Sequence, residues 1–282
     1  MQLIDGKKVS LAIREELKDK VRVLNEKRGY PLKLVVIIVG NDPASEIYVN
    51  NKAKACEEVG IYSETIRLDA NTTQSELESV LRKYSIDDKT DGILLQLPLP
   101  SHLDKNSALR IIPDEKDVDG FSVGNVGKLT LFYDDALFSC TPSGIMRLLK
   151  FYDIKLAGKH AVVVGRSNIL GKPVALMLLK EDCTVTICHS KTENLADYTR
   201  QADILVLAVG KKHLVTADMV KDGAVVIDAG ICRENGKIYG DADFDEVSKK
   251  ASYISPVPGG VGPMTITSLL CNTYEAGARK LK

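Results

Sequence analysis

The segment "AVVVGRSNILGKP", residues 161–173, has the pattern of a buried β-strand that enters a helix through a glycine turn. Many α/β proteins hold the phosphates of a nucleotide at such a unit, with backbone N–H groups and the helix N-terminus. The usual G-x-G-x-x-G spacing is absent, because Gly165 is followed by Arg166 and the next glycine is Gly171. A plain structural turn that carries an exposed arginine is therefore the alternative interpretation.

The next expected strand indicates which nucleotide the turn would bind. It ends in His189, Ser190 and Lys191, where proteins specific for NAD usually carry Asp or Glu for the ribose hydroxyls. An acidic residue would repel a phosphate on that ribose, whereas hydroxyl and basic groups accept one. Arg166 can reach the same region with a planar group that donates two hydrogen bonds. The two strand ends together predict NADP rather than NAD, with Arg166 and Ser190 at the extra phosphate.

Apolar strand patterns alternate with helical patterns on both sides of this unit, which predicts a doubly wound α/β fold in both halves of the chain. Short runs of Val, Ile and Leu without polar alternation are typical of parallel strands buried on both faces. Residues 113–140 show no clear period and are interpreted as the connection between two domains. The expected strands are residues 33–40, 62–68, 91–100, 159–165, 184–190, 202–210 and 223–231.

Size and composition exclude several classes of protein. The 282 residues are enough for two domains, and 38 Lys plus Arg balance 38 Asp plus Glu, without the clustered positive charge of a nucleic-acid-binding surface. No apolar run approaches the ~18 residues that span a bilayer, and the N-terminus does not resemble a signal peptide. The six cysteines form no C-x-x-C pair. We therefore expect a cytoplasmic protein with reduced thiols, no metal site and no membrane partner.

One lysine is out of place on an expected helix over residues 42–60. At ~100° per residue, Lys52 falls in the middle of the apolar face, one turn beyond Tyr48. Partial desolvation there would favour the neutral amine and bring the Lys52 pKa toward working pH. The alternative is that only the stem packs while the ammonium group reaches water. The face consists of Ala44, Tyr48, Val49, Ala55, Cys56 and Val59.

Three further features depart from their local pattern. Gln96 interrupts an apolar strand near its carboxyl end, where open α/β sheets bind ligands, although it could instead be a solvated edge residue. Asp119 precedes Gly120 and could be a mere turn former. Residues 256–263 contain three glycines and three prolines directly before a helix. Such a loop is stiff and lets a ligand approach its backbone closely.

In this order, the motifs resemble the bifunctional methylenetetrahydrofolate dehydrogenase/methenyltetrahydrofolate cyclohydrolase family over nearly the whole chain. Several long motifs in a fixed order are far more specific than one glycine turn. They are Y-V-x-x-K-x-K at 48–54, G-I-L-L-Q-L-P-L-P at 92–100, K-D-V-D-G-F at 116–121, C-T-P-S-G at 140–144, V-V-V-G-R-S-x-I-L-G-K-P at 162–173, C-H-S-K-T at 188–192 and P-V-P-G-G-V-G-P-M-T at 256–265.

The resemblance implies a two-domain α/β enzyme. An N-terminal α/β catalytic lobe, residues 1–139 completed by a C-terminal helix over 262–282, would bind folate. Residues 140–261 would form an NADP-binding Rossmann-type domain with a doubly wound parallel sheet. The folate would lie in a cleft between the domains, and the NADP domain would form most of a homodimer interface. The implied reactions are NADP-dependent oxidation of 5,10-methylenetetrahydrofolate to the 5,10-methenyl form and its hydrolysis to 10-formyltetrahydrofolate.

The resemblance also implies residue roles. Lys52 would be the central cyclohydrolase residue, supported by Tyr48 and Gln96, and Asp119 would anchor the pterin ring. Pro258, Gly259 and Gly260 would border the folate and the nicotinamide. The NADP site would be lined by Gly165, Arg166, Ser167, Ser190 and Ile231.

The sequence leaves two alternative functions open. A monofunctional dehydrogenase of the same family would oxidise the methylene group without hydrolysing the product, but hydride transfer alone does not require the pair Lys52 and Gln96. A non-enzymatic regulator that senses NADP through a Rossmann module would not require the motifs of the first domain.

Overall fold

The computed structural model describes residues 1–281 with the exception of the Ala44 side chain, and the chain divides into two compact units. The six-stranded unit comprises residues 1–11 and 141–265, and the three-stranded unit comprises residues 12–140 and 266 to the C-terminus. The long helices α1 (Gly6–Arg28) and α10 (Val261–Arg279) contribute to both. Among the described helices, none is both long and apolar enough to cross a membrane.

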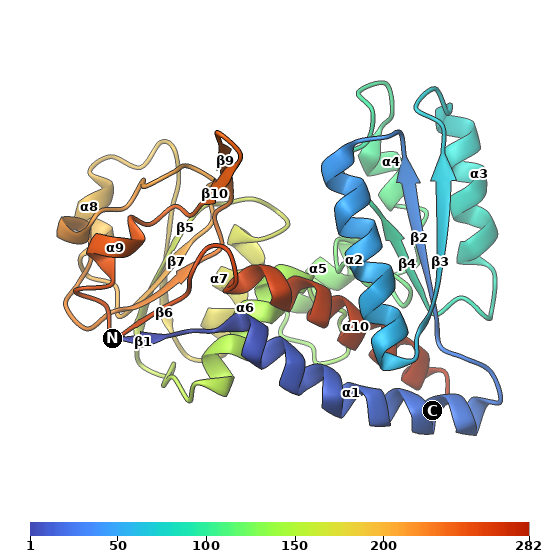
Figure 1. The fold of residues 1–282 in the computed structure, drawn as a ribbon, viewed down its shortest axis with the longest axis horizontal. Coiled ribbons are helices and arrows are strands. Elements are labelled where there is room, and N and C mark those ends of the chain that lie inside the picture. The colour runs from blue at the N-terminus through green and yellow to red at the C-terminus, as the bar shows by residue number, and fades with distance from the viewer. Residues whose placement is uncertain (282) are drawn as a thin grey trace. The chain divides into compact units, whose positions relative to one another are not determined.

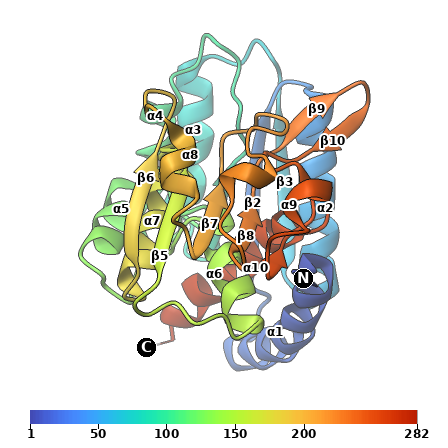
Figure 2. The same ribbon diagram turned by 90° about the vertical axis from the view of Figure 1, so that its left-hand side faces the viewer.

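The six-stranded unit contains a fully parallel sheet whose strand order reverses at β5 (Figure 2). In β5, Val164 pairs with Cys188 of β6 on one side and with Leu207 of β7 on the other, so the carboxyl ends of these strands meet at one edge. The order across the sheet is β1 (Gln2–Leu3), β11 (Tyr253–Ile254), β8 (Val225–Asp228), β7 (Ile204–Leu207), β5 (His160–Val164) and β6 (Thr184–Cys188).

Helices and one hairpin complete this unit. The apolar core beside the sheet includes Val162, Leu205 and Val226, all completely buried. The remaining elements are α6 (Cys140–Phe151), α7 (Gly171–Lys180), α8 (Leu195–Thr199), η1 (Ala217–Met219), α9 (Phe244–Val247) and the antiparallel pair β9 (Cys232–Glu234) and β10 (Lys237–Tyr239).

The three-stranded unit is built around β2 (Lys33–Val39), which pairs in parallel with β3 (Tyr62–Leu68) and β4 (Gly92–Leu95) (Figure 1). Alternate residues of β2 enter two different cores, as the pleat of a strand requires. Leu34, Val36 and Ile38 pack with α2 (Pro43–Val59), whereas Val35, Ile37 and Val39 pack with α3 (Gln74–Ser85). Burial on both faces explains the unbroken apolar run, and the predicted α/β class is confirmed.

The expected irregular connection over residues 113–140 was wrong in one respect. Residues Val123–Thr130 form helix α5, because Ser122 Oγ accepts a hydrogen bond from Asn125 N and Leu129 is buried. Eight residues are too few for a recognisable period. The expected strand over 91–100 also ends early, at Leu95, and a short helix α4 (Lys105–Leu109) follows it.

The N-terminus lies in the six-stranded unit rather than in the unit that contains most of the expected first domain. Gln2 N donates to Ser252 O at 2.7 Å and Ile4 N donates to Ile254 O at 2.8 Å, which adds β1 to the sheet beside β11. A strand of two residues is too short to be recognised from its sequence pattern.

Candidate functional site

Lys52 is buried in the three-stranded unit, at 8% exposure. It lies on α2, whose N-terminus is capped by Asp42 Oδ2 through Ser45 N at 2.8 Å and whose C-terminus ends at Gly60 in the left-handed conformation. Tyr48 precedes Lys52 by four residues on this helix and is 36% exposed. The expected position of Lys52 on the buried face is confirmed.

The Lys52 ammonium group has a defined partner. Its Nζ donates to Gln96 Oε1 at 2.9 Å, and Gln96 Nε2 donates to Leu97 O at 2.6 Å. Gln96 directly follows β4, and its own N–H still donates to Ile37 O at 2.8 Å, so the side chain is anchored at the carboxyl end of the sheet. The two side chains are thus joined by a hydrogen bond, and the interpretation of Gln96 as a merely solvated edge residue is wrong.

Asp119 lies half-buried in a turn near this pair. Gly120 closes the turn with a φ of +72°, and its N–H donates to Asp117 O at 3.1 Å. Burial raises the pKa of Asp119 to about 6, with a further increase from the Asp117 carboxylate. The charge of Lys52 and a hydrogen bond with Cys140 act in the opposite direction. Asp119 is thus both a turn residue and an ionisable group within electrostatic reach of Lys52.

The residues that hold this turn are not apparent from the sequence pattern. Asp117 is buried, and its carboxylate accepts hydrogen bonds from Gly120 N at 3.1 Å and Ser122 N at 2.7 Å. The buried Lys116 ammonium group donates to Ser85 O and Asp87 O at 2.8 Å each, which ties the turn to the end of α3. The motif "KDVDGF" contains two acidic residues, but their spacing alone does not show which carboxylate binds the backbone N–H groups of the turn.

A second set of missed residues lies behind Asp119. The Cys140 thiol is buried and donates to Val118 O at 3.2 Å, and burial raises the Cys140 pKa well above its usual range. Asn272 on α10 donates to Val118 O and to Phe138 O, at 2.8 Å each. The C-terminal helix therefore supports the Asp119 turn directly. Its sequence carries no indication of this, because the contacting residues lie more than 130 positions apart.

In the six-stranded unit, close backbone packing explains the glycines of the first turn. A Cβ at Gly165, whose φ is +134°, would lie 2.5 Å from Ala208 O, and a Cβ at Gly171 would lie 2.3 Å from Gly165 O. Arg166 and Ser167 are exposed between them. Arg166 forms no hydrogen bond or ion pair with any of residues 1–281, whereas Ser167 Oγ accepts one from Gly171 N at 3.3 Å. Arg166 is free to bind an anion.

The end of β6 lies beside this turn, because β5 and β6 are paired up to their last residues, Val164 and Cys188. His189 N donates to Thr192 Oγ1 at 2.8 Å, and Lys191 N donates to His189 Nδ1 at 3.2 Å, which folds the segment into a tight turn. Ser190 is exposed at its tip. The neighbouring strand ends present an arginine and a serine with no carboxylate among residues 189–191.

The loop over residues 256–260 packs against the beginning of α1. Gly6 N donates to Gly259 O at 3.1 Å, and a Cβ at Gly6 would lie 1.7 Å from Gly260 O. Gly259 has a φ of +109° and Pro258 is exposed. Part of the glycine content therefore serves packing within the unit, which the sequence pattern does not indicate. Ile231, 47% exposed, lies three residues beyond the end of β8.

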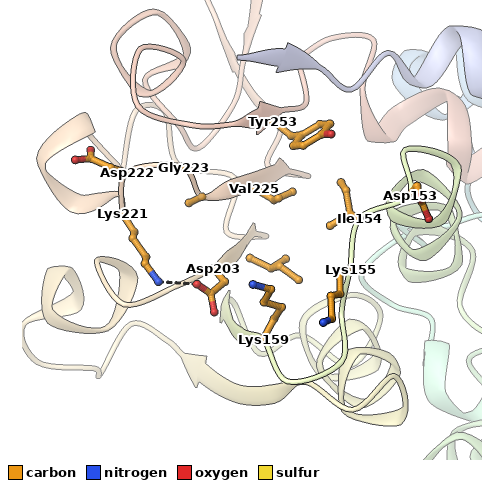
Figure 3. A pocket seen from close by; sticks show the side chains of 12 residues that line it. Asp153, Ile154, Lys155, Lys159, Asp203, Lys221, Asp222, Gly223, Val225 and Tyr253 are labelled. Atoms are coloured by element: carbon orange, nitrogen blue, oxygen red, sulfur yellow. Dashed lines mark hydrogen bonds and ion pairs between the residues drawn. The ribbon is translucent and has the colours of Figure 1, made fainter.

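A cavity of about 240 Å³ lies at the opposite edge of this sheet (Figure 3). Its lining includes residues at or just before the first residues of β5, β7 and β8, among them Lys159, Asp203 and Val225. Asp203 is already paired with Lys221 at 2.6 Å. None of the predicted site residues lines this cavity, and parallel sheets bind ligands at their carboxyl edge. We therefore do not place the functional site there.

The two units thus carry different chemistry. The three-stranded unit brings together a buried lysine, an amide that holds it and a half-buried carboxylate, which is a set suited to proton transfer. The six-stranded unit offers an unpaired arginine, exposed hydroxyl groups and a helix N-terminus, which suit phosphate. Within the described part of the chain, no group of three or more His, Cys, Asp or Glu side chains is arranged to hold a metal ion.

Comparison with known proteins gives one consistent result. The tetrahydrofolate dehydrogenase/cyclohydrolase catalytic domain model matches residues 4–119, and the NAD(P)-binding domain model of the same family matches residues 139–281. The bifunctional protein FolD of Campylobacter hominis is 55% identical, over 100% of this chain and 99% of that protein.

Solved structures agree with these matches. The bifunctional dehydrogenase/cyclohydrolase FolD of Campylobacter jejuni has a TM-score of 0.97 at 52% identity, over 99% of each chain. The Trypanosoma brucei enzyme, solved with NADP and an inhibitor, has a TM-score of 0.94 at 40% identity, over 99% of this chain and 98% of that one. The chain therefore belongs to the tetrahydrofolate dehydrogenase/cyclohydrolase family.

Proposed function

We propose that this chain catalyses two successive reactions, the NADP-dependent oxidation of 5,10-methylenetetrahydrofolate and the hydrolysis of the resulting 5,10-methenyl form to 10-formyltetrahydrofolate. Both domain models of the family match, and the relatives at 52–55% identity are named bifunctional. The proposed hydrolysis rests on one observation, the hydrogen bond of 2.9 Å from Nζ of the buried Lys52 to Gln96 Oε1. A dehydrogenase alone has no use for that pair.

The donor groups of the six-stranded unit fit NADP. Arg166 and Ser190 would bind the phosphate on the ribose, while Gly165 and Ser167 would lie along the pyrophosphate at the N-terminus of α7. Ile231, Pro258, Gly259 and Gly260 would border the nicotinamide, with the last three also facing the folate. When bound, NADP supplies the hydride acceptor, and the protein holds the two reacting carbons in contact.

The three-stranded unit would bind the folate and carry out the hydrolysis. Asp119 would accept two hydrogen bonds from the aminopyrimidinone edge of the pterin, a pairing strengthened by the carboxylate charge. The methenyl carbon is electrophilic, so hydrolysis requires proton transfers from and to the attacking water and the ring nitrogen. Lys52 would exchange these protons, Gln96 would orient the Lys52 amine, and Tyr48 would assist from the preceding turn of α2.

We expect substrate affinity to fall as the pH is lowered through about 6. Burial raises the pKa of Asp119 to about 6, so its carboxylate is fully charged only above that pH, and protonation leaves one acceptor fewer for the pterin. The measurement is the KM for methylenetetrahydrofolate from pH 5 to 8. An Asp119→Asn variant, which cannot ionise there, should bind weakly at every pH and lose the inflection. An inflection that persists in that variant would refute the assignment.

We expect Arg166→Ala to raise the KM for NADP by about tenfold to a hundredfold and to change the KM for NAD little, because a charge-assisted bidentate contact with phosphate contributes about 1.5–3 kcal/mol. Steady-state rates with each cofactor measure this directly. Lys172→Ala is a matched control for the loss of one positive charge, because the Lys172 ammonium group already has a partner within the chain: its Nζ donates to Asn168 Oδ1 at 2.8 Å. Equal effects of Arg166→Ala on both cofactors would contradict the role.

The complete function is tested by mixing the purified protein with methylenetetrahydrofolate and NADP and following NADPH and methenyl absorbance together. NADPH that rises without matching methenyl accumulation, with 10-formyltetrahydrofolate as the end product, supports both activities. Methenyl that accumulates one-for-one with NADPH and decays only at its rate in buffer would support the monofunctional alternative. No turnover at all would support the non-enzymatic regulator.

Four further assignments belong to this proposal. We assign folate chemistry to the segment predicted over residues 1–139 with helix 262–282, and NADP binding to residues 140–261. A homodimer that forms through the NADP-binding domain, and a cytoplasmic location, stay predictions from the sequence and the family resemblance.

A further inference from the structure

Two buried carboxylates lie beneath the loops that follow β7 and β8 in the six-stranded unit. Asp228, the last residue of β8, is 3% exposed, and Asp241, which follows the β9–β10 hairpin, is fully buried. Among the described residues, their hydrogen-bond partners are backbone N–H groups rather than basic side chains. Neither residue is apparent as a functional candidate from the sequence pattern.

Asp241 holds the loop after β7. Its Oδ2 accepts a hydrogen bond from Val209 N at 2.7 Å, and its Oδ1 accepts one from Lys211 N at 2.6 Å. Between them Gly210 adopts a φ of +76°. The backbone of Asp241 is itself anchored, because Val215 N donates to Asp241 O at 3.0 Å. Both carboxylate oxygens therefore bind the backbone of one loop, and the Asp241 backbone that carries them is itself held in place.

Asp228 holds the loop after β8 and joins it to the Asp241 segment. Its Oδ1 accepts from Gly230 N at 2.9 Å and from Asp241 N at 3.1 Å, and its Oδ2 accepts from Ala242 N at 2.8 Å. A Cβ at Gly230 would lie 2.1 Å from the Asp241 carboxyl group, and a Cβ at Gly240 would lie 2.1 Å from Asp228 Oδ2. The contact is so close that only glycine fits at both positions.

A third loop is attached to the backbone of Asp228. Asp228 N donates to Ser255 Oγ at 2.8 Å, and Ser255 directly precedes the 256–260 loop. Val257 of that loop has its Cγ2 3.0 Å from where a Cβ at Gly240 would lie. The loops that carry Ile231 and Pro258 are thus connected through one buried polar cluster.

The strand order indicates what these loops would contact. They follow β7, β8 and β11, which lie on the other side of β5 from β6 and Ser190. A dinucleotide whose ribose phosphate is bound by Arg166 and Ser190 must extend across the carboxyl ends of β7 and β8. We propose that Asp228 and Asp241 are positioning residues that hold these loops in the conformation that accepts the nicotinamide half of the cofactor. This inference rests on the proposed function.

The test is the variant Asp241→Asn. The amide has the shape of the carboxylate, but one of its two terminal atoms is an NH₂ donor, so either Val209 N or Lys211 N would face another donor. We expect the Kd of NADPH to rise by about tenfold or more, while the Kd of 2′,5′-ADP, which carries only the adenosine half, changes by less than about twofold. Fluorescence titration of NADPH and calorimetric titration of 2′,5′-ADP measure the two constants.

Asp203→Asn is the matched control. Asp203 also accepts a backbone hydrogen bond, from His160 N at 3.0 Å, but lies at the amino edge of the same sheet beside the cavity of Figure 3. The Asp203→Asn variant should leave the Kd of NADPH and the Kd of 2′,5′-ADP unchanged. Wild-type protein that binds no NADPH would overturn the proposed function and this inference with it. Normal wild-type binding together with unchanged NADPH binding by Asp241→Asn, or equal weakening of NADPH and 2′,5′-ADP, would overturn the inference alone.

A measurement on the unmodified protein keeps the inference testable if the variant does not fold. Amide hydrogen exchange in the free wild-type chain should be slow at Val209, Lys211 and Gly230, because their N–H groups are bonded to buried carboxylates. Gly236, at the exposed tip of the β9–β10 hairpin, serves as the fast reference. Exchange at the three sites as fast as at Gly236 would overturn the inference.

Discussion

Replacing Lys52 by methionine should reduce the cyclohydrolase rate by about 10²- to 10⁴-fold, the usual contribution of a positioned acid–base group. Methionine keeps most of the length of the buried stem and removes the group that exchanges protons. Gln96 loses its partner at the same time. The dehydrogenase step needs no such group, so part of it should survive. In the combined assay, methenyl absorbance should then accumulate one-for-one with NADPH.

Lys54→Met is the matched control, because Lys54 lies two residues further along α2 and is exposed. The control separates a loss of positive charge on the helix from the loss of the buried amine. Hydrolysis that continues undiminished in Lys52→Met would show that Lys52 is a structural lysine. A parallel fall of both activities in Lys52→Met would instead indicate damage to folate binding, and a KM measurement would reveal it.

Replacing Asp91 by alanine should lower the free energy of unfolding by about 3–5 kcal/mol, as expected when one partner of a buried ion pair is removed. The Asp91 side chain is completely buried, and the Arg28 side chain is 1% exposed. Asp91 Oδ1 lies 2.8 Å from Arg28 Nη2 and 3.0 Å from Lys280 Nζ, and Oδ2 accepts from Lys33 N at 2.9 Å. Alanine would leave the buried Arg28 guanidinium group without its carboxylate and the Lys33 N–H without its side-chain acceptor.

The position of Asp91 explains why this loss should be large. It links the end of α1, the start of β2 and the residue after α10, so three segments of the three-stranded unit meet at one carboxylate. Arg28 Nε and Nη1 already lack a partner within the described residues, although the guanidinium group lies 4.3 Å from the centre of the Tyr30 ring. The remaining contacts therefore cannot compensate for Asp91.

Urea unfolding followed by far-UV circular dichroism measures this difference. Asp19→Ala is the control, because Asp19 forms an ion pair with Arg22 at 3.7 Å in which both side chains are mostly exposed. Such a pair contributes about 0–1 kcal/mol. A midpoint for Asp91→Ala that lies as close to wild type as that of Asp19→Ala would contradict the prediction.

Much of the architecture was predictable from local pattern. The bounds of β2 and β3 and the start of α2 follow from apolar runs and from the Asp42–Pro43 cap, which are properties of neighbouring residues. Helix α5 was missed because its eight residues include two glycines and give no measurable period. Its formation depends on the burial of Leu129, which is a tertiary contact.

The candidate site was predictable where a residue contradicts its surroundings. Lys52 on an apolar helix face and Gln96 in an apolar strand both stand out, and the structure joins them by a hydrogen bond. Asp117 was missed because two carboxylates two residues apart in a turn look equivalent in a sequence. Only in the folded chain does the Asp117 carboxylate accept hydrogen bonds from the N–H groups of Gly120 and Ser122, while Asp119 stays half-exposed.

The sequence by itself determined the α/β class, the resemblance to the family and the residue types available for proton transfer and phosphate binding. These depend on periodicity and on motifs within a few residues. The tertiary structure alone decided which buried charges are paired, as Arg28 with Asp91, and which backbone N–H groups Asp228 and Asp241 hold. The free energy of a buried charge depends on every group around it, and the chain brings those groups together only when it folds.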